Sequence, residues 1–315
     1  MMKLIFRWLI LGGTLFFLAK ALKDHWLEVT AIRIEPAEWA IIAIAIGITL
    51  LAHTWAGWVW TWVLRDLNQP VHSPKFIQIY LKTNIAKYLP GNIWHYYGRI
   101  MAVKDAGASA STAALSVLLE PLLMVAAALI VVILSSIFVA ENTMAMEIAQ
   151  ILGLLVVLCA IHPWFLNRVL SLLQRLKVKK TTSQQPSAPS HIERYPLRPL
   201  LGELGFLGLR SAGFIITLFA LCPLNFSEIP LLLEAFSLAW LLGVIVPVPA
   251  GLGVFEATAI ALLNHHYPAA IVISSTGLYR LVSILAETVG ATAAWLDGVR
   301  NQETEVRTQK SGDGS

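Results

Sequence analysis

Charged residues are scarce in this sequence. Asp, Glu, Lys and Arg make up 13% of its 315 residues, whereas a soluble domain carries about 25%. Hydrophobic residues make up 57%, above the roughly 45–50% of soluble domains. This balance excludes an ordinary soluble globular protein, because too few polar side chains remain to cover its surface.

Recognisable metal-binding and catalytic patterns are also lacking. The two cysteines, Cys159 and Cys222, lie inside apolar runs, so they form neither a disulfide framework nor a zinc site. The sequence has no HExxH spacing and no visible Ser-His-Asp arrangement. The Gly-Leu-Gly stretch at 251–253 lacks the third glycine of a nucleotide-binding fingerprint. We therefore expect no metal, no cofactor and no catalytic residues.

Long apolar runs dominate what is present. A run of about 20 apolar residues crosses a bilayer as a helix, and we expect seven spans. The first run also resembles a signal peptide, because Ala19-Lys20-Ala21 loosely matches a cleavage site; we favour an uncleaved span. The sequence therefore predicts an all-α, polytopic membrane helix bundle. The expected spans cover residues 4–22, 39–64, 112–138, 148–173, 200–222, 229–246 and 270–296.

Two segments, 74–107 and 247–264, contain helices that are too short to span a membrane. In the first segment an amphipathic stretch precedes a break, and a short aromatic helix follows at 93–103. In the second, a break precedes a short apolar helix at 254–263. Proline and glycine interrupt helices. The residues expected to make the two breaks are Pro90, Gly91, Pro249, Gly251 and Gly253.

The polar stretch at 174–199 divides the chain. It begins with basic residues and continues with a low-complexity run, a composition typical of a flexible linker. We expect an N-terminal half at 1–173, a cytoplasmic linker at 174–199, a C-terminal half at 200–298 and a disordered tail at 299–315.

The net charge of +4 is small and gathers in loops, which argues against nucleic acid as a partner. Residues 65–107 contain six Lys and Arg and residues 168–199 contain seven, whereas 139–147 and 223–230 contain none. Basic loops stay in the cytoplasm. The pattern predicts a protein of the cytoplasmic membrane with both termini in the cytoplasm.

The two broken segments resemble each other. Gly91 precedes Glu120 by 29 residues, and Gly251 precedes Arg280 by 29. In each copy a break opens a short helix, and the following long span carries one ionisable residue. The charge pattern sends the two long spans across the membrane in opposite directions. This predicts an inverted-topology repeat, which in transporters brackets a binding site near the membrane midplane.

Glu120 and Arg280 are the leading site candidates. An ionisable residue deep in a spanning helix costs about 2.5–3.5 kcal/mol, so each needs a cavity or a partner. Two interpretations remain open: the residues bind a lipid headgroup, or they form a structural ion pair. Further candidates are Arg99, which can hold a phosphate or anchor the helix, Arg210, Glu256, which can cap amides or pair with an arginine, and Glu287. We interpret Glu203 as interfacial.

Several motifs carry a resemblance to a known family. They are Pro90-Gly91-Asn92-Ile93, Arg99, Leu118-Leu119-Glu120, the run from Pro249 to Glu256, and Leu278-Tyr279-Arg280-Leu281. Over about residues 40–298 the chain resembles the flippase-like family related to the membrane domain of lysylphosphatidylglycerol synthetases. The family typically has arginine after the first motif's glutamate, where this chain has Pro121. The resemblance implies lipid binding or translocation.

Three functions follow as hypotheses. The leading one is a transporter of lipids or lipid-linked precursors, with membrane lipids of anionic or zwitterionic headgroup as partners. The second is a non-transporting scaffold for a separately encoded lipid-modifying synthase. The third is an intramembrane enzyme that uses Glu120 or Glu256 as a base, which the lack of a nucleophile or metal set argues against.

Overall fold

The computed structural model describes residues 35–88, 93–139, 144–178, 194–246 and 248–312, together with Lys23 and Leu27. Within these ranges the chain is helical and contains no strand, so the all-α prediction is confirmed there. The predicted span at 4–22, the break at Pro90 and Gly91, and most of the predicted linker lie outside the described residues.

Five helices of the described chain are long and apolar enough to cross a membrane. Each coincides with one predicted span, so the polytopic prediction is confirmed. Among the described residues the count is five, or six if one bent pair is a single span; the seventh predicted span, at 4–22, lies outside them, so the total of seven stays a prediction. The five helices are α3 (Pro36–Asp66), α6 (Ala110–Ser136), α9 (Leu197–Phe219), α10 (Ile229–Ile245) together with the turn before it from Phe226, and the part of α12 (Ala269–Gly312) up to Arg300.

The bent pair corrects the prediction of one continuous span at 148–173. Helix α7 (Met144–Ala160) ends before His162, and α8 (Pro163–Val178) leaves at an angle of 61°. The cause is Pro163, which lacks an amide hydrogen and disfavours helical geometry in the residue before it. The chain therefore turns at a position where hydropathy alone indicated a continuous helix.

Short helices occupy both segments that we predicted to be broken. The first contains α4 (Ser73–Asn84), the 3-10 turn η1 (Ile85–Tyr88) and α5 (Trp94–Asp105). The second contains η3 (Pro249–Gly251) and α11 (Val254–Leu263), and η2 (Phe226–Glu228) precedes α10. Helix α12 continues to Gly312, into the stretch at 299–315 for which we expected a disordered tail; the disorder of that tail stays a prediction.

The break between α10 and α11 depends on unusual backbone conformations. Ala250, Gly251 and Gly253 have φ angles of 50°, 65° and 81°, a region that glycine adopts readily and alanine does not. A Cβ atom on Gly251 would lie 3.0 Å from the carbonyl oxygen of Gly243. The break therefore needs glycine at 251, because the turn folds directly onto α10.

Helices α3 and α9 approach closely through small residues. A Cβ atom on Gly202 would lie 2.6 Å from Val59 Cγ2, and one on Gly213 would lie 2.5 Å from Thr49 Oγ1. Small residues allow close backbone contact between membrane helices, where packing replaces the hydrophobic effect as the driving force. This seam fixes α3 and α9 against each other along most of their length.

Aromatic rings join the C-terminal helices. Phe214 of α9, Phe236 of α10, Phe255 of α11 and Tyr279 of α12 lie with every pair of ring centroids within 6.1 Å. Tilted and edge-on arrangements of this kind are favourable. The cluster holds the short helix α11 against three long ones.

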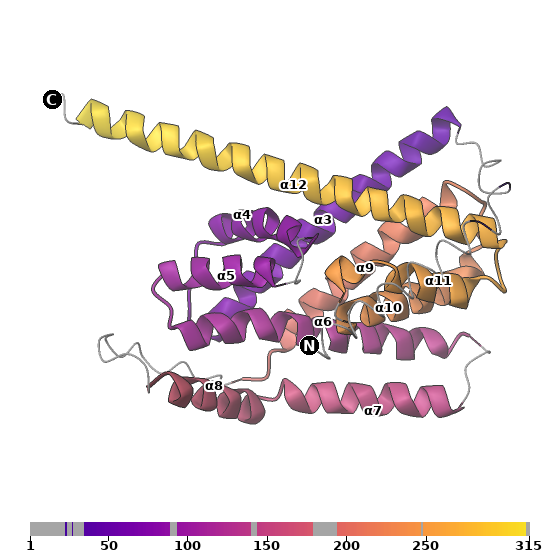
Figure 1. Ribbon diagram of the computed structural model, residues 1–315, viewed down its shortest axis with the longest axis horizontal. Helices are drawn as coiled ribbons and strands as arrows, with labels where there is room; N and C mark the ends of the chain where they lie inside the picture. Colours follow the sequence, from indigo (N-terminus) through magenta and orange to yellow (C-terminus); the bar gives the residue numbers. More distant parts are fainter. Residues whose placement is uncertain are drawn as a thin grey trace.

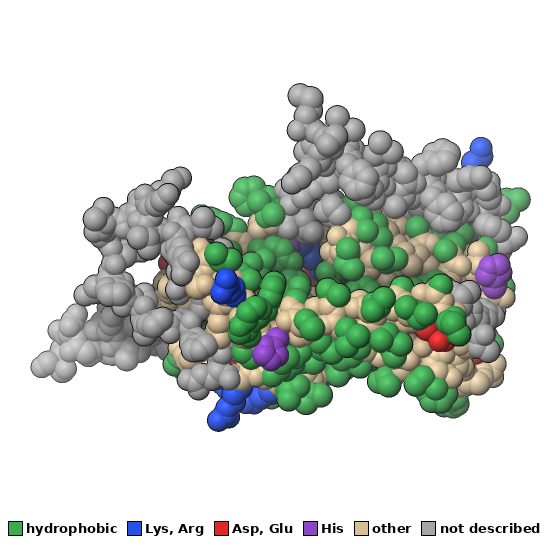
Figure 2. Space-filling view, turned by 90° about the horizontal axis from the view of Figure 1, so that it is seen from below, with side chains coloured by type: hydrophobic (Ala, Val, Ile, Leu, Met, Phe, Trp, Pro, Cys, Tyr) green, Lys and Arg blue, Asp and Glu red, His purple; other side chains and the backbone are tan. Residues whose placement is uncertain are grey.

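Figure 1 shows the arrangement of the helices along the molecule. Helices α6 and α12 run in opposite directions, and α4, α5 and α8 lie at the end toward which α12 points (Figure 1). Figure 2 shows hydrophobic side chains over much of the described part of one face. Exposed apolar residues such as Leu155 and Val156 of α7 suit contact with lipid tails. The superposition of the two copies stays a prediction.

Candidate functional site

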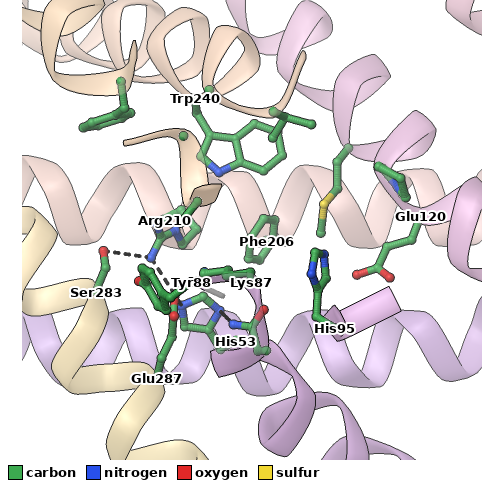
Figure 3. A pocket seen from close by; sticks show the side chains of 18 of the residues that line it. His53, Lys87, Tyr88, His95, Glu120, Phe206, Arg210, Trp240, Ser283 and Glu287 are labelled. Carbon is green, nitrogen blue, oxygen red and sulfur yellow. Dashed lines mark hydrogen bonds and ion pairs between the residues drawn. The ribbon is translucent and has the colours of Figure 1, made fainter. Parts of the chain in front are cut away.

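A cavity of about 180 Å³ lies where both broken segments meet the long helices. Its walls come from α3, α4, η1, α5, α6, α9, α10, η3, α11 and α12. Five of the six predicted substrate-binding residues line it, and several are visible in Figure 3. They are Arg99, Glu120, Arg210, Arg280 and Glu287; the sixth, Glu256, lies behind Arg280.

Arg99 and Glu120 form an enclosed ion pair at one end of the cavity. Arg99 Nη1 donates to Glu120 Oε2 at 2.8 Å, and each side chain is only 3% exposed. The Tyr80 hydroxyl donates to the other carboxylate oxygen at 2.6 Å. The Arg99 guanidinium also lies 3.6 Å from the centre of the Tyr80 ring. Both charges are therefore compensated within the protein, which a buried pair needs if it is to be stable.

Arg280 and Glu256 form a second pair beside the α10–α11 break. Arg280 Nε and Nη2 approach Glu256 Oε1 at 2.7 and 2.6 Å. The other oxygen of Glu256 accepts the Gly253 amide at 2.8 Å, so Glu256 both caps α11 and pairs with an arginine. Arg280 Nη1 donates to the Ala250 carbonyl at 2.9 Å. One guanidinium thus holds the carboxylate and the strained turn together.

The structure corrects the hypothesis that Glu120 and Arg280 pair with each other. Both line the same cavity, but each is bonded to a residue of the short helix in its own segment. The reason is local. Helix α5 carries Arg99, which is opposite in charge to Glu120 on the next long helix, α6. Helix α11 carries Glu256, which is opposite in charge to Arg280 on the next long helix, α12. Arg99 therefore pairs with a buried carboxylate. Its role is not only to anchor a helix at the membrane boundary, which was one of the two interpretations from the sequence.

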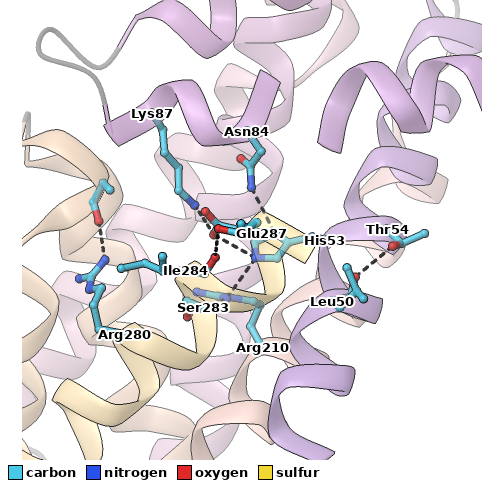
Figure 4. Close-up of polar contacts among 12 residues, drawn as sticks. Leu50, His53, Thr54, Asn84, Lys87, Arg210, Arg280, Ser283, Ile284 and Glu287 are labelled. Atoms are coloured by element: carbon cyan, nitrogen blue, oxygen red, sulfur yellow. Dashed lines mark hydrogen bonds and ion pairs between the residues drawn. The ribbon is translucent and has the colours of Figure 1, made fainter. Parts of the chain in front are cut away.

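Glu287 organises a third cluster, drawn in Figure 4. Its Oε1 atom lies 2.6 Å from Lys87 Nζ and 3.1 Å from His53 Nε2. Its Oε2 atom is buried and has no hydrogen-bond partner among the described residues. The cluster joins η1, α3 and α12, and it leaves one carboxylate oxygen available to a ligand.

Arg210 lies beside this cluster without a carboxylate partner among the described residues. Asn84 Nδ2 is 3.4 Å from His53 Nδ1, so Nδ1 is the acceptor and Nε2 carries the proton that it donates to Glu287. Arg210 Nη1 lies 3.3 Å from the same Nε2 atom. Because this nitrogen carries a hydrogen, it does not serve as an acceptor for Arg210. The remaining side-chain bond of Arg210 is to Ser283 at 3.2 Å, and its buried Nε has no acceptor.

The charges that line the cavity do not balance. Four cations, Lys87, Arg99, Arg210 and Arg280, and two carboxylates, Glu120 and Glu287, line it, and a third carboxylate, Glu256, pairs with Arg280, so the excess is one cation. Burial lowers the pKa of His95 to about 3, and nearby Arg99 and Lys87 act in the same direction, so this imidazole adds no charge. The lining therefore attracts anions, with Arg210 as the least compensated cation.

Sequence reasoning missed three residues of the site. We counted Lys87 only as a topology signal, passed over His53 as a histidine in a span, and assigned Tyr80 no role. A signal existed for Lys87, because it directly precedes the predicted break. The other two depend on how α3 and α4 pack, which the sequence does not display.

Residues 5–290 match the family model described as the lysylphosphatidylglycerol synthase TM region. The chain belongs to this family. No curated protein matches the chain. As a member of this family it is a membrane protein, and the expected resemblance is confirmed. The family typically has an arginine directly after the glutamate that corresponds to Glu120, whereas this chain has Pro121. The cation that pairs with Glu120 is instead Arg99 of α5. Among the described residues no three His, Cys, Asp or Glu side chains group to hold a metal.

Proposed function

We propose that the protein moves the headgroups of lipids or lipid-linked precursors across the cytoplasmic membrane. The observation that carries this proposal is the cavity inside the helical bundle, which is lined by four cations and two carboxylates. A charged residue inside a membrane protein normally faces a pathway or a partner. Here the excess of positive charge favours a phosphate-bearing headgroup over a neutral one.

Arg210 is the main contact for that phosphate. Its guanidinium has unused donors, and arginine can bind phosphate with two parallel hydrogen bonds. The nearby Glu287 Oε2 is an unused acceptor, which suits an ammonium or hydroxyl group on the same headgroup. An anionic or zwitterionic lipid therefore fits this cluster.

The break between α10 and α11 serves as the gate. In many transporters broken helices form the midplane binding site, and one repeat moves against the other around it. Arg280 holds this break closed through Glu256 and the Ala250 carbonyl. A headgroup phosphate competes for Arg280, so its arrival weakens the contacts that keep the turn in place.

A reconstitution experiment tests the proposal. The purified full chain is placed in liposomes that contain phospholipids with a fluorescent tail, and an impermeant reductant measures movement between leaflets. We expect faster movement with the wild type than with empty liposomes, and an approximately tenfold loss in Arg210→Gln. Arg168→Gln, at an exposed position of α8, is the matched control. Equal rates with and without protein would refute transport.

One alternative has its own support. The family match is to the membrane region of a synthase family, which favours a scaffold that holds a separate lipid-modifying synthase. A scaffold would leave lipid movement at the level of empty liposomes and would co-purify with a soluble enzyme. The Arg210 and Arg168 variants would then behave alike.

A further inference from the structure

Glu203 is a buried carboxylate that the proposed transport pathway does not use. Its residue exposure is 0%, and neither carboxylate oxygen has a hydrogen-bond partner among the described residues. Our sequence interpretation of Glu203 as an interfacial residue was wrong, because α9 packs this turn against α3 and α6. A buried carboxyl group without a donor is costly in its charged form and is normally neutralised.

Its position links Glu203 to the cavity. Phe206 and Arg210 follow at three and seven residues, so all three lie on one face of α9, and the latter two line the cavity. In Figure 3 Phe206 lies between Arg210 and Glu120. Glu203 interacts electrostatically with Glu120 and Arg99, which places it at the Glu120 end of the cavity.

The charges at that end require a proton. One cation, Arg99, serves two carboxyl groups, and its hydrogen bond goes to Glu120. Tyr80 also donates to Glu120. A charged Glu203 would add a second negative charge that interacts with Glu120 and has no donor of its own, and burial together with a like charge favours the neutral form of a carboxyl group.

Other ionisable groups do not relieve this excess. On the elements that pack against α9, the remaining titratable or charged side chains include His53 and Asp66 of α3, Glu234 of α10, and Arg280 and Glu287 of α12. The cations among them already serve other carboxylates: Arg280 pairs with Glu256, and the His53 imidazole bonds to Glu287. Glu203 is therefore neutral while the helices are closed around it.

We propose that Glu203 is a proton-binding site that couples headgroup movement to the transmembrane proton gradient. The inference rests on the proposed transport function. When α6 moves away from the α3–α9 pair, the carboxyl O–H bond breaks, its electron pair stays on oxygen, and the proton passes to cavity water that is open to one side of the membrane. Before α6 closes again, Glu203 takes up one proton from water that is open to the other side, so each cycle carries one proton across the membrane together with the headgroup.

The test uses the full chain in liposomes with the fluorescent lipid and an imposed pH gradient. A gradient of about one pH unit biases a one-proton step about tenfold at equilibrium. We expect the distribution of lipid between leaflets to shift by up to that factor with the wild type. Glu203→Gln, which cannot release a proton, should lose this shift. Glu147→Gln, at an exposed position of α7, should retain it.

Each other outcome is decisive. A wild type that moves lipid without any response to the gradient overturns the coupling and leaves transport intact. A Glu203→Gln variant that responds like the wild type overturns it as well. If the wild type moves no lipid, the proposed function fails, and the coupling fails with it.

Infrared spectroscopy of the wild type tests the protonation state itself and does not depend on transport. A neutral carboxyl band that disappears in Glu203→Gln, or that shifts in frequency in Glu203→Asp if the amide variant does not fold, supports the site. A fully ionised Glu203 at neutral pH refutes it.

Discussion

The two ion pairs of the site have the same construction with the charges exchanged. In the first segment the arginine is on the short helix α5 and the glutamate on the long helix α6; in the second, the glutamate is on α11 and the arginine on α12. Arg99 and Glu120 are each 3% exposed, whereas Arg280 is 19% exposed. The first pair is a closed structural element, and the second is an accessible contact on a strained turn.

Removing the charge of Glu120 should have the largest effect on stability. Glu120→Gln leaves Arg99 enclosed without a carboxylate, which costs about 3–5 kcal/mol. Thermal and denaturant unfolding in detergent measure the loss. An apolar double variant, Arg99→Met with Glu120→Leu, should recover most of it, since no buried charge remains. A single variant as stable as the wild type would show that the pair is not structural.

The equivalent change in the second pair should cost less stability. Glu256→Gln leaves Arg280 with water access and with the Ala250 carbonyl, so we expect a loss of about 1–3 kcal/mol. The rate of lipid movement should rise in this variant, because the turn loses the carboxylate that helps to hold the break closed. If both glutamine variants lose equal stability, the distinction between the closed and the accessible pair is wrong.

Arg210 should behave unlike either pair. It has no carboxylate partner among the described residues, so Arg210→Gln leaves no orphaned charge, and we expect a stability change within about 1 kcal/mol. The rate of lipid movement should nevertheless fall about tenfold. A large loss of stability with unchanged transport would make Arg210 a structural residue.

The last prediction concerns sidedness and should leave stability unchanged. If the two segments enter from opposite faces, a cysteine at exposed Lys104 of the first and one at exposed His265 after the second will label differently. In a background without Cys159 and Cys222, an impermeant reagent should label His265→Cys in intact cells. Lys104→Cys should react only after permeabilisation. Equal labelling would contradict the inverted arrangement.

The sequence predicted the long helices well because hydropathy is a local property. The bounds of α11 matched residue for residue, and α10 differed from the prediction by a single position at its end. The bend before Pro163 was missed, since we gave more weight to the apolar run than to the proline. The partners of the charged residues were also missed, because they depend on how short helices fold back.

Glu203 illustrates the limit of reasoning from position along a helix. It lies near the start of α9, where an acidic residue normally faces headgroups or water. Its burial follows from the contact of α9 with α3 and α6, which no spacing within α9 reveals. Residues at the ends of spans therefore need a packing argument before they are assigned to the membrane surface.

The glycine seam between α3 and α9 has a mechanical consequence. The backbone of α9 at Gly202 and Gly213 lies so close to the side chains of Val59 and Thr49 that there is no room for a Cβ atom at either glycine. In the proposed transport cycle, these two helices stay together while other elements move. His53 lies on α3 and Arg210 on α9, so under that proposal their relative positions are kept while α10, η3 and α11 change conformation.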